Sequence, residues 1–238
     1  MAGKKFAKFK KSLRTVLVVL LAAVLILPPL GVLVHRWAPV PMTYLMVDRA
    51  FEGEGLHHKW RPLKKISPNL VYAVIAAEDA KFCTHHGFDF DAIEKAMKHN
   101  EKHRRVRGGS TISQQTAKNV FLWPQRSWVR KGLEAYYTVL IEALWPKKRI
   151  IEVYLNVVEW APGVYGAEAA SQKWYGKSAD KLTKKEAARL AAILPSPRKW
   201  KAAGSGPYVR KRSSKISAAS GTVRHEGLAT CVYPSGKP

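Results

Sequence analysis

The spacing of the apolar side chains constrains the fold of this chain more than any other feature of its sequence. Between residues 130 and 145 these side chains recur every three or four positions, which places them on one face of a helix. They are Leu133, Tyr136, Tyr137, Leu140, Ile141 and Leu144. The period-two alternation of half-buried strands is scarce along the chain. The sequence therefore predicts a mainly α-helical domain.

Local signals indicate where further helices begin and end. Ser67 and Pro68 are typical of a helix start, because proline suits the first helical position. Thr183 and Glu186 form a capping box, and Pro195 ends the helix that this box opens. Other helices are expected at 91–100, 111–122, 130–145, 148–155, 165–175 and 184–194, with a short basic helix at 208–220.

An uncharged, strongly apolar stretch runs from Thr15 to Val34. As a helix, its twenty residues reach about 30 Å, which is the thickness of a bilayer core. The cations that precede it favour a cytoplasmic N-terminus; they are Lys4, Lys5, Lys8, Lys10, Lys11 and Arg14. A cleaved signal peptide is the alternative, but Pro28-Pro29 offers no small-residue cleavage site. We expect an uncleaved, single-pass anchor.

Charge and cysteine content bear on partners and compartment. Lys and Arg number 41 against 17 Asp and Glu, a formal net charge of +24. Such a charge is compatible with nucleic acid, anionic lipid or a pyrophosphate-bearing substrate. The two cysteines, Cys83 and Cys231, lack the spacing of a metal site. In an oxidising compartment they form either one disulfide or two free thiols.

Composition divides the chain into five segments. We expect a basic cytoplasmic tail at 1–14, a transmembrane anchor at 15–37, a linker at 38–66, a catalytic domain at 67–205 and a basic C-terminal extension at 206–238. Within the domain, the polar and mostly basic stretch 98–107 is expected to form a loop.

A glycine-rich segment follows that loop, from Arg107 to Gln115, with Lys118 and Asn119 just beyond it. Glycines let backbone amides approach a ligand closely, and a helix N-terminus favours anions. The segment lacks the Lys-Ser or Lys-Thr pair of a P-loop. It fits either a phosphate-binding helix start or an ordinary capped helix.

Two acidic residues are candidates for acid–base chemistry at the end of an apolar helix. Desolvation there would raise the pKa of Glu78 towards that of a general base. Solvated acids in a helix-terminal turn are the alternative for Glu78 and Asp79. His85, in the next turn, is expected to make local hydrogen bonds rather than bind a metal, because no spacing supplies a third ligand.

Glu134 lies on the flank of its helix's apolar stripe and is either a site residue or an exposed helical acid. Gathered around one cleft, the nearby cations would neutralise a pyrophosphate leaving group; they are Lys118, Arg126, Arg130 and Lys131. The aromatic and apolar residues among them fit core packing or, as favoured here, insertion into a membrane interface. These are Phe121, Leu122, Trp123 and Trp128.

Taken together, these features resemble glycosyltransferase family 51, the glycosyltransferase domain of peptidoglycan synthases, from about residue 67 to about residue 200. Five ordered blocks carry the resemblance. They are Glu78-Asp79-x-x-Phe82-x-x-His85-x-Gly87; Gly108-Gly109-Ser110-Thr111-Ile112-x-Gln114-Gln115-x-x-Lys118-Asn119; Arg130-Lys131-x-x-Glu134; Lys148-Arg149-Ile150-Ile151-Glu152-x-Tyr154-Leu155-Asn156; and Tyr165-Gly166 through Ala169-Ala170 to Tyr175-Gly176-Lys177.

The resemblance implies a lysozyme-like, mainly α fold with a membrane-facing lobe, preceded by one transmembrane helix. It implies polymerisation of lipid II into β-1,4-linked glycan with release of undecaprenyl pyrophosphate. The chain shows no room for a transpeptidase domain, so the monofunctional biosynthetic branch is expected. Glu78 would be the general base and Glu134 a second essential carboxylate. Residues expected to bind substrate are Asp79, Ser110, Thr111, Gln115, Lys118, Asn119, Arg126 and Arg130.

The resemblance also sets expectations for cofactor, partners and location. No cofactor is required, although a divalent cation, Mg or Mn, is compatible with the pyrophosphate. Expected partners are lipid II, the growing glycan chain, the membrane and proteins of cell division or cell-wall synthesis, with no nucleic acid. The catalytic domain is expected on the periplasmic side of the bacterial inner membrane.

Two other classes of function stay open at this point. A lysozyme-like hydrolase or lytic transglycosylase would also use a carboxylate in a helical cleft. A non-catalytic, membrane-anchored basic protein would explain the net charge equally well. Chain growth from lipid II distinguishes the expected enzyme from both.

Overall fold

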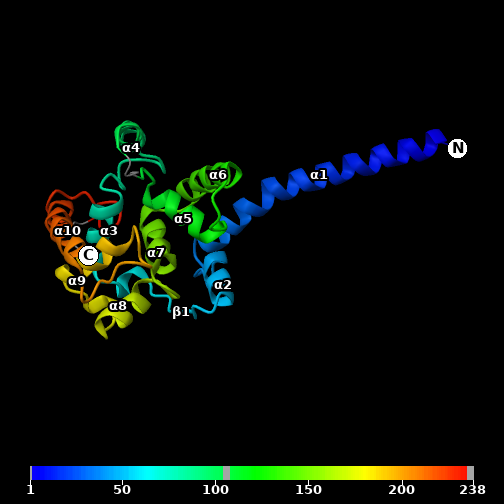
Figure 1. The fold of residues 1–238 in the computed structure, drawn as a ribbon. Helices are drawn as coiled ribbons and strands as arrows, with labels where there is room; N and C mark the ends of the chain where they lie inside the picture. Colours follow the sequence, from blue (N-terminus) through cyan, green and yellow to red (C-terminus); the bar gives the residue numbers. More distant parts are fainter. Residues whose placement is uncertain (1, 104–107, 235–238) are drawn as a thin grey trace. The chain divides into compact units, whose positions relative to one another are not determined.

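The computed structural model describes residues 2–103 and 108–234 (Figure 1). Residues 98–102 of the basic loop expected at 98–107 instead continue a helix, and residues 104–107 lie outside the described part of the chain. The chain divides between Ala38 and Pro39 into two units, which are described separately.

The first unit is built on the helix α1 (Ala2–His35), which continues through Pro28 and Pro29. Across the residues that the structure describes, no helix combines the length and the apolar character needed to cross a membrane. The anchor expected at 15–37 stays a prediction.

The second unit is mainly helical, as the apolar spacing predicts. Its helices are α2 (Tyr44–Phe51), α3 (Pro68–Glu78), α4 (Phe90–Lys102), α5 (Ile112–Phe121), α6 (Trp128–Leu144), α7 (Lys147–Val157), α8 (Ala167–Tyr175), α9 (Lys184–Ile193) and α10 (Pro207–His225). Short 3₁₀ turns occur at η1 (Leu63–Lys65) and η2 (Ala179–Lys181). Strands β1 (His57–His58), β2 (Glu159–Ala161) and β3 (Val164–Tyr165) form a small sheet in the order β1-β3-β2. In this sheet β1 runs parallel and β2 antiparallel to β3.

Side-chain caps explain where several helices begin. The expected capping box at Thr183 opens α9, and Thr111 forms a second box with Gln114 at the start of α5. Ser67 precedes α3, but its hydroxyl donates to the Leu182 carbonyl at 2.8 Å rather than capping the helix. The structure thus uses Ser67 to attach the start of α3 to the segment before α9.

Two groups of packed helices make up this unit. The helices α3, α9 and α10 pack against one another, and α5 packs against α6 and α7 (Figure 1). Ile150, Ile151 and Leu155 on α7 are fully buried, as are Leu70 and Ile75 on α3. Burial of this apolar surface is the main driving force for folding.

Residues 39–66, expected as a linker, belong to the folded unit. Met46 of α2 is fully buried, Leu63 is 3% exposed, and β1 pairs with β3. The apolar runs of this segment are short, so its burial depends on contacts with later parts of the chain, which composition does not reveal.

The short basic helix expected at 208–220, within the C-terminal extension at 206–238, is confirmed but is longer than expected. Residues Pro207 to His225 form one long helix, α10, which is packed against α3 and α9. Val209, Ile216 and Val223 recur every seven positions and are buried, although most of their neighbours are basic or small. The high charge of the segment obscured this apolar stripe.

The helix expected at 165–175 begins later, at Ala167. Tyr165 pairs with β2, and Gly166 turns the chain with a φ of 82°. A Cβ at Gly166 would lie 2.7 Å from the Asn156 carbonyl oxygen, so a side chain there would collide with α7.

Candidate active site

A cavity of about 760 Å³ opens at the C-terminal end of α3 and contains Glu78. Residues from α3, α4, the 108–110 segment, α5, the chain after α9, and α10 line it. They are Ala77, Glu78, His99, Gly108, Ser110, Gln115, Pro195, Trp200, Tyr208, Arg212 and Lys215. The carboxylate expected as a base therefore lies in a concave site of a size suited to a substrate.

The surroundings of Glu78 favour its protonated form. Burial raises the pKa of Glu78, and this effect outweighs the hydrogen bond from Gln115 and the charge of Arg212, which both lower the pKa. Gln115 Nε2 donates to Glu78 Oε2 at 3.1 Å, and the Arg212 guanidinium lies 3.9 Å from Oε1. A carboxylate with a raised pKa suits proton transfer near neutral pH.

Tyr154, which the motif analysis left without a role, orients Gln115. Its hydroxyl donates to Gln115 Oε1 at 3.2 Å, which directs the amide nitrogen of Gln115 towards Glu78. Tyr154 is fully buried, and burial raises its pKa well above the ordinary value, so the hydroxyl keeps its proton. A chain of hydrogen bonds thus runs from α7 through α5 to the carboxylate at the end of α3.

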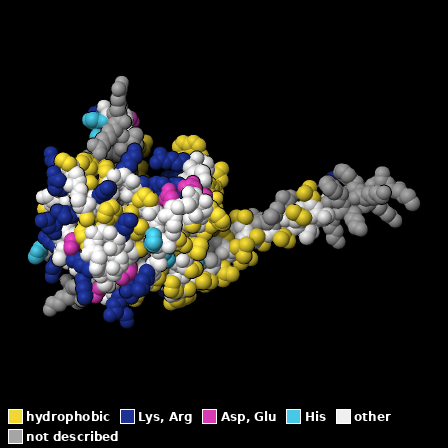
Figure 2. Space-filling view, turned by 60° about the horizontal axis from the view of Figure 1, so that its bottom comes forward, with side chains coloured by type: hydrophobic (Ala, Val, Ile, Leu, Met, Phe, Trp, Pro, Cys, Tyr) yellow, Lys and Arg dark blue, Asp and Glu magenta, His cyan; other side chains and the backbone are white. Residues whose placement is uncertain are grey.

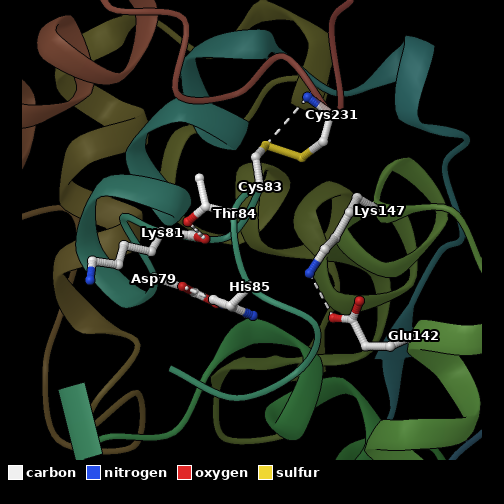
Figure 3. The surroundings of a disulfide bond; sticks show 8 residues. All are labelled: Asp79, Lys81, Cys83, Thr84, His85, Glu142, Lys147 and Cys231. Carbon is white, nitrogen blue, oxygen red and sulfur yellow. Dashed lines mark hydrogen bonds and ion pairs between the residues drawn. A yellow bond between two sulfur atoms is a disulfide. The ribbon is translucent and has the colours of Figure 1, made fainter. Parts of the chain in front are cut away.

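Asp79 does not line the 760 Å³ cavity, but together with Glu78 it lines a smaller neighbouring cavity of about 300 Å³. The Asp79 carboxylate accepts a hydrogen bond from the Ile112 amide at 2.9 Å and lies 2.9 Å from His85 Nε2 (Figure 3). The Gly87 amide donates to His85 Nδ1 at 3.1 Å, so Nε2 carries the proton that faces Asp79. The expected local hydrogen-bonding role of His85 is confirmed.

The glycines and the threonine of the first two blocks have packing roles. A Cβ at Gly87 (φ 94°) would lie 2.8 Å from Thr138 Cγ2, and one at Gly109 would lie 3.1 Å from Ile93 Cα. Thr111 is buried and donates to the Gly87 carbonyl at 2.6 Å while it caps α5. These residues hold α4, α5 and α6 close together beside Glu78.

A disulfide joins this turn to the C-terminal segment. Cys83 and Cys231 are bonded, with their Cα atoms 5.4 Å apart (Figure 3). Beside Cys83, Phe82 is fully buried under the Lys147 ammonium, which lies 4.7 Å from the ring centroid and 2.7 Å from Glu142. Of the two arrangements open from sequence, the structure has the disulfide.

The second acidic candidate, Glu134, is buried between two cations. It is 4% exposed; Arg130 donates to it at 2.9 Å, and Lys131 is hydrogen-bonded to its other oxygen. The i, i+4 and i, i+3 spacings on α6 bring these three side chains together. Glu134 is therefore not the exposed helical acid of the alternative, and its role as a site residue stays a prediction.

The Lys118 ammonium belongs to the same electrostatic cluster. Burial lowers the pKa of Lys118; Glu134 raises it, while the charges of Arg130, Lys131 and Arg126 lower it further. Arg126 is exposed in the segment between α5 and α6, and Asn119 is half-buried on α5. Arg130 and Lys131 thus pair with Glu134, and Arg126 and Lys118 lie close enough to influence the same cluster electrostatically.

The sequence of this chain is similar to those of known proteins. A family model described as Transglycosylase matches residues 46–220. The biosynthetic peptidoglycan transglycosylase of Caulobacter vibrioides is 60% identical over 223 residues, which cover 94% of this chain and 97% of that protein. The chain belongs to the transglycosylase family. Relatives with the same name occur in Rhodospirillum centenum (51% identity; 92% of this chain, 95% of the relative) and Pseudomonas aeruginosa (53%; 78% and 82%). Membership confirms the resemblance and the enzyme class that it implied.

In this transglycosylase, α10 supplies part of the cavity wall that motif reasoning missed. Tyr208, Arg212 and Lys215 follow an i, i+4, i+7 spacing, which places them on one face of α10. Trp200 packs against Tyr208 with ring centroids 4.8 Å apart. That spacing was available in the sequence, but only the packing of α10 on α3 shows which helix face lines the cavity.

The aromatic segment after α5 differs in part from its expected membrane role. Leu122 is 4% exposed and belongs to the core, whereas Phe121 and Trp123 are half-buried. Phe121 stacks on Tyr137 with ring centroids 4.5 Å apart. Trp128 is 92% exposed. Val129 on α6 and Phe51 on α2 are exposed as well. Figure 2 shows hydrophobic side chains gathered on one side of this unit, while Lys and Arg are spread over the visible face.

The described residues do not form a metal site of their own. Among them, no group of three or more His, Cys, Asp and Glu side chains is arranged to hold an ion. The carboxylate nearest the cation cluster, Glu134, is already paired with Arg130 and Lys131.

Proposed function

We propose that this transglycosylase polymerises lipid II into β-1,4-linked glycan strands for the bacterial cell wall. In each step the sugar 4-hydroxyl of one lipid II molecule attacks C1 of the sugar at the lipid-linked end of the growing strand. The new bond joins O4 to C1, the bond from C1 to phosphate breaks, and undecaprenyl pyrophosphate leaves. The names of the relatives, biosynthetic peptidoglycan transglycosylases, support this reaction.

The observation that carries the proposal is the position of α5 between a base and an anion site. Gln115 on α5 contacts Glu78. Lys118, one turn later on α5, interacts electrostatically with Glu134 and with the cations beside Glu134. Three residues of helix advance about 4.5 Å. A proton acceptor and a set of cations this close together suit a reaction in which a hydroxyl attacks and a pyrophosphate leaves.

Each group has a separate task in the proposed reaction. Glu78 takes the proton from the attacking hydroxyl, and its pKa, raised by burial, improves its match to that role. Lys118, Arg130 and Arg126 stabilise the charge that develops on the leaving pyrophosphate. Glu134 holds Arg130 and Lys131 in place through its two ion pairs.

The remaining expected substrate-binding residues divide into two groups. Ser110 lines the cavity, and Asn119 is accessible on α5, so we assign both to substrate contact. Asp79 and Thr111 already use their polar atoms within the protein, so we assign them to positioning the turn and the start of α5. A divalent cation would be bound mainly by pyrophosphate oxygens and is not required for these roles.

We propose that the protein acts at the periplasmic face of the inner membrane, through a single-pass anchor. The support is the apolar stretch Thr15 to Val34 with its preceding cations. A disulfide also suits an oxidising compartment. Trp128, Val129 and Phe51 are exposed apolar side chains of the kind that a membrane-facing lobe of a lysozyme-like domain would carry.

Incubation of the purified full-length chain with lipid II tests the proposed function. We expect glycan strands that lengthen with time, and no products from the Glu78→Gln variant. A wild-type chain that shortened finished glycan and left lipid II unchanged would instead be a hydrolase or lytic enzyme. A chain that bound glycan without either reaction would be non-catalytic.

A further inference from the structure

A second cavity, of about 550 Å³, lies between α9 and α10 and has a basic lining. We call it the basic groove. Its residues are Lys184, Lys185, Arg189, Arg210, Ser213, Ser214, Ser217 and Ala218. No acidic residue is among them, so four cations and three hydroxyls surround a space of ligand size. The reaction proposed above uses none of these side chains.

The positive charge of the basic groove is not compensated within the protein. Over the described part of the chain, no carboxylate forms an ion pair with Lys184, Lys185 or Arg189. The nearest acid in sequence, Glu186, is held by Lys177 at 2.6 Å and by the cap of α9. The two lysines also occupy the first turn of α9, where the helix dipole disfavours cations. An anionic ligand would pair with these cations and would also offset their unfavourable interaction with the helix dipole.

The Lys184 side chain reaches from α9 across to α10, beside Gly221. The Lys184 Nζ atom lies 3.3 Å from the position that a Cβ at residue 221 would take. A side chain there would crowd the ammonium group. The cation is therefore placed between the two helices, where it can meet a ligand in the groove.

The basic groove and the cavity that contains Glu78 lie on opposite flanks of α10. Arg212 and Lys215 line the cavity, while Arg210 and Ser217 line the groove. About 100° of rotation per residue separates the two pairs by roughly half a turn. A helix is about 10–12 Å wide with its side chains, and the exposed Lys211 lies on the surface between them. Positive charge thus continues from the cavity, across α10, into the groove.

We propose that the basic groove binds the acidic peptide groups of the glycan strand as the strand leaves the cavity that contains Glu78. This inference rests on the proposed function. A peptide attached to a sugar through its amino end finishes in a carboxylate, so a peptide-bearing glycan is a polyanion. Lys and Arg form charge-assisted hydrogen bonds with carboxylates, and serine hydroxyls also donate to them. Binding here keeps the product close while the next unit is added.

The test compares two full-length variants that lose the same charge. Lys184→Gln/Lys185→Gln/Arg189→Gln alters the groove and spares Arg210, which holds the Ser205 carbonyl at 2.7 Å. The control, Lys64→Gln/Lys65→Gln/Lys181→Gln, removes three exposed lysines that line neither cavity. The probes are soluble glycan strands that carry peptides and the same strands after enzymatic removal of the peptides.

We expect the groove variant to bind peptide-bearing strands about tenfold more weakly than wild type, since several exposed charge contacts are lost together. The control variant should bind as wild type does. Strands without peptides should bind all three proteins equally weakly. With lipid II, the groove variant should form its first glycosidic bond at the wild-type rate but release shorter strands.

Equal affinity of the groove variant and wild type for peptide-bearing strands would overturn the proposal, as would tight binding of stripped strands. A loss of binding seen only with vesicles that contain anionic phospholipid would identify a lipid headgroup as the occupant instead. If unfolding shows that the triple variant is damaged, Lys184→Gln/Lys185→Gln, which keeps the half-buried Arg189, replaces it. Strand binding needs no turnover, so a wild type that binds but does not polymerise refutes the proposed function alone.

Discussion

At the scale of single residues, Glu78 shows how its neighbours adjust one carboxyl group. Burial raises its pKa, whereas Gln115 and Arg212 favour the charged form. The neighbouring Asp79 raises the pKa a little further and is itself held by His85 and the Ile112 amide. A carboxyl group in this environment accepts a proton more readily than a solvated glutamate does.

The first prediction concerns the base itself. Glu78→Gln removes the proton acceptor, and we expect lipid II turnover to fall by about 10³–10⁴-fold, the upper part of the range for general bases. The folded protein raises the pKa of Glu78. Ionisation of Glu78 therefore lowers the stability of the fold at pH values above the pKa that this group has in the unfolded chain. The variant should therefore have a Tm at pH 7 no lower than that of wild type. Near-normal turnover would show that another group is the base.

The second prediction concerns the pH profile. A raised pKa of Glu78 places the acid limb of kcat/KM above the ordinary range of a glutamate. Arg212→Gln removes a charge that lowers this pKa, so the limb should move to higher pH. Lys211→Gln, an exposed residue on the same helix, is the control and should leave the limb in place. If the acid limb of Arg212→Gln stays at the wild-type pH, Arg212 does not lower the pKa of the base.

At the scale of helices, α5 links the two halves of the site. It begins at the capping box of Thr111, contacts Glu78 through Gln115, and carries Lys118 into the cation cluster. Tyr154 of α7 fixes the amide of Gln115 from the other side. A small shift of α5 would therefore alter the base and the anion site together.

The third prediction tests the anion site on this helix. Lys118→Ala should lower kcat by about 10²–10³-fold, since it exposes charge on the departing pyrophosphate. Lys102→Ala, an exposed lysine at the end of α4, serves as the control and should leave kcat unchanged. Wild-type kinetics of Lys118→Ala at saturating lipid II would remove Lys118 from the proposed cluster.

At the scale of the whole molecule, the disulfide joins residues 148 positions apart. It attaches the segment after α10 to the turn that carries Phe82 and His85, so the C-terminal side of α10 is held against that turn. This arrangement stabilises the wall of the cavity formed by Arg212 and Lys215 as well as the turn beside Glu78.

The fourth prediction follows from this closure. In the chain-entropy model, closing so long a loop is worth up to ~4–5 kcal/mol of unfolding free energy. Cys83→Ser/Cys231→Ser should therefore lower the Tm strongly, and reduction of the wild-type protein should lower it to a similar value. Thiol labelling after denaturation should find no reactive cysteine in the unreduced wild type. Two labelled cysteines would show that the disulfide does not form.

The fifth prediction concerns contact of the folded unit with lipid. A chain that begins at Pro39 should still bind anionic liposomes at low salt, because Trp128, Val129 and Phe51 are exposed on a basic unit. Trp128→Ser/Phe51→Ser should weaken this binding several-fold. Phe90→Ser, which removes another exposed aromatic residue, is the control. No affinity of the unit for liposomes would exclude these residues as a membrane surface.

Much of the local structure and most of the site were predictable from the sequence. Helix periodicity, the capping box at Thr183 and the five motif blocks depend on residues a few positions apart, so the chain itself displays them. They led to a mainly helical domain, to Glu78 and Glu134 as candidate carboxylates, and to the family. For the two cysteines the sequence left a bridge and free thiols equally open, because it does not show whether their Cα atoms approach.

Only the tertiary structure decided which distant residues meet. Gln115 reaches Glu78 over 37 positions and Tyr154 reaches Gln115 over 39, contacts that no local pattern encodes. The burial that raises the pKa of Glu78 arises from the packing of several helices. The helix α10, which lies in the basic C-terminal segment, supplies Arg212 and Lys215 to the cavity wall. Local sequence determines each helix and its faces; the packing of apolar faces against one another decides which polar face lines a cavity.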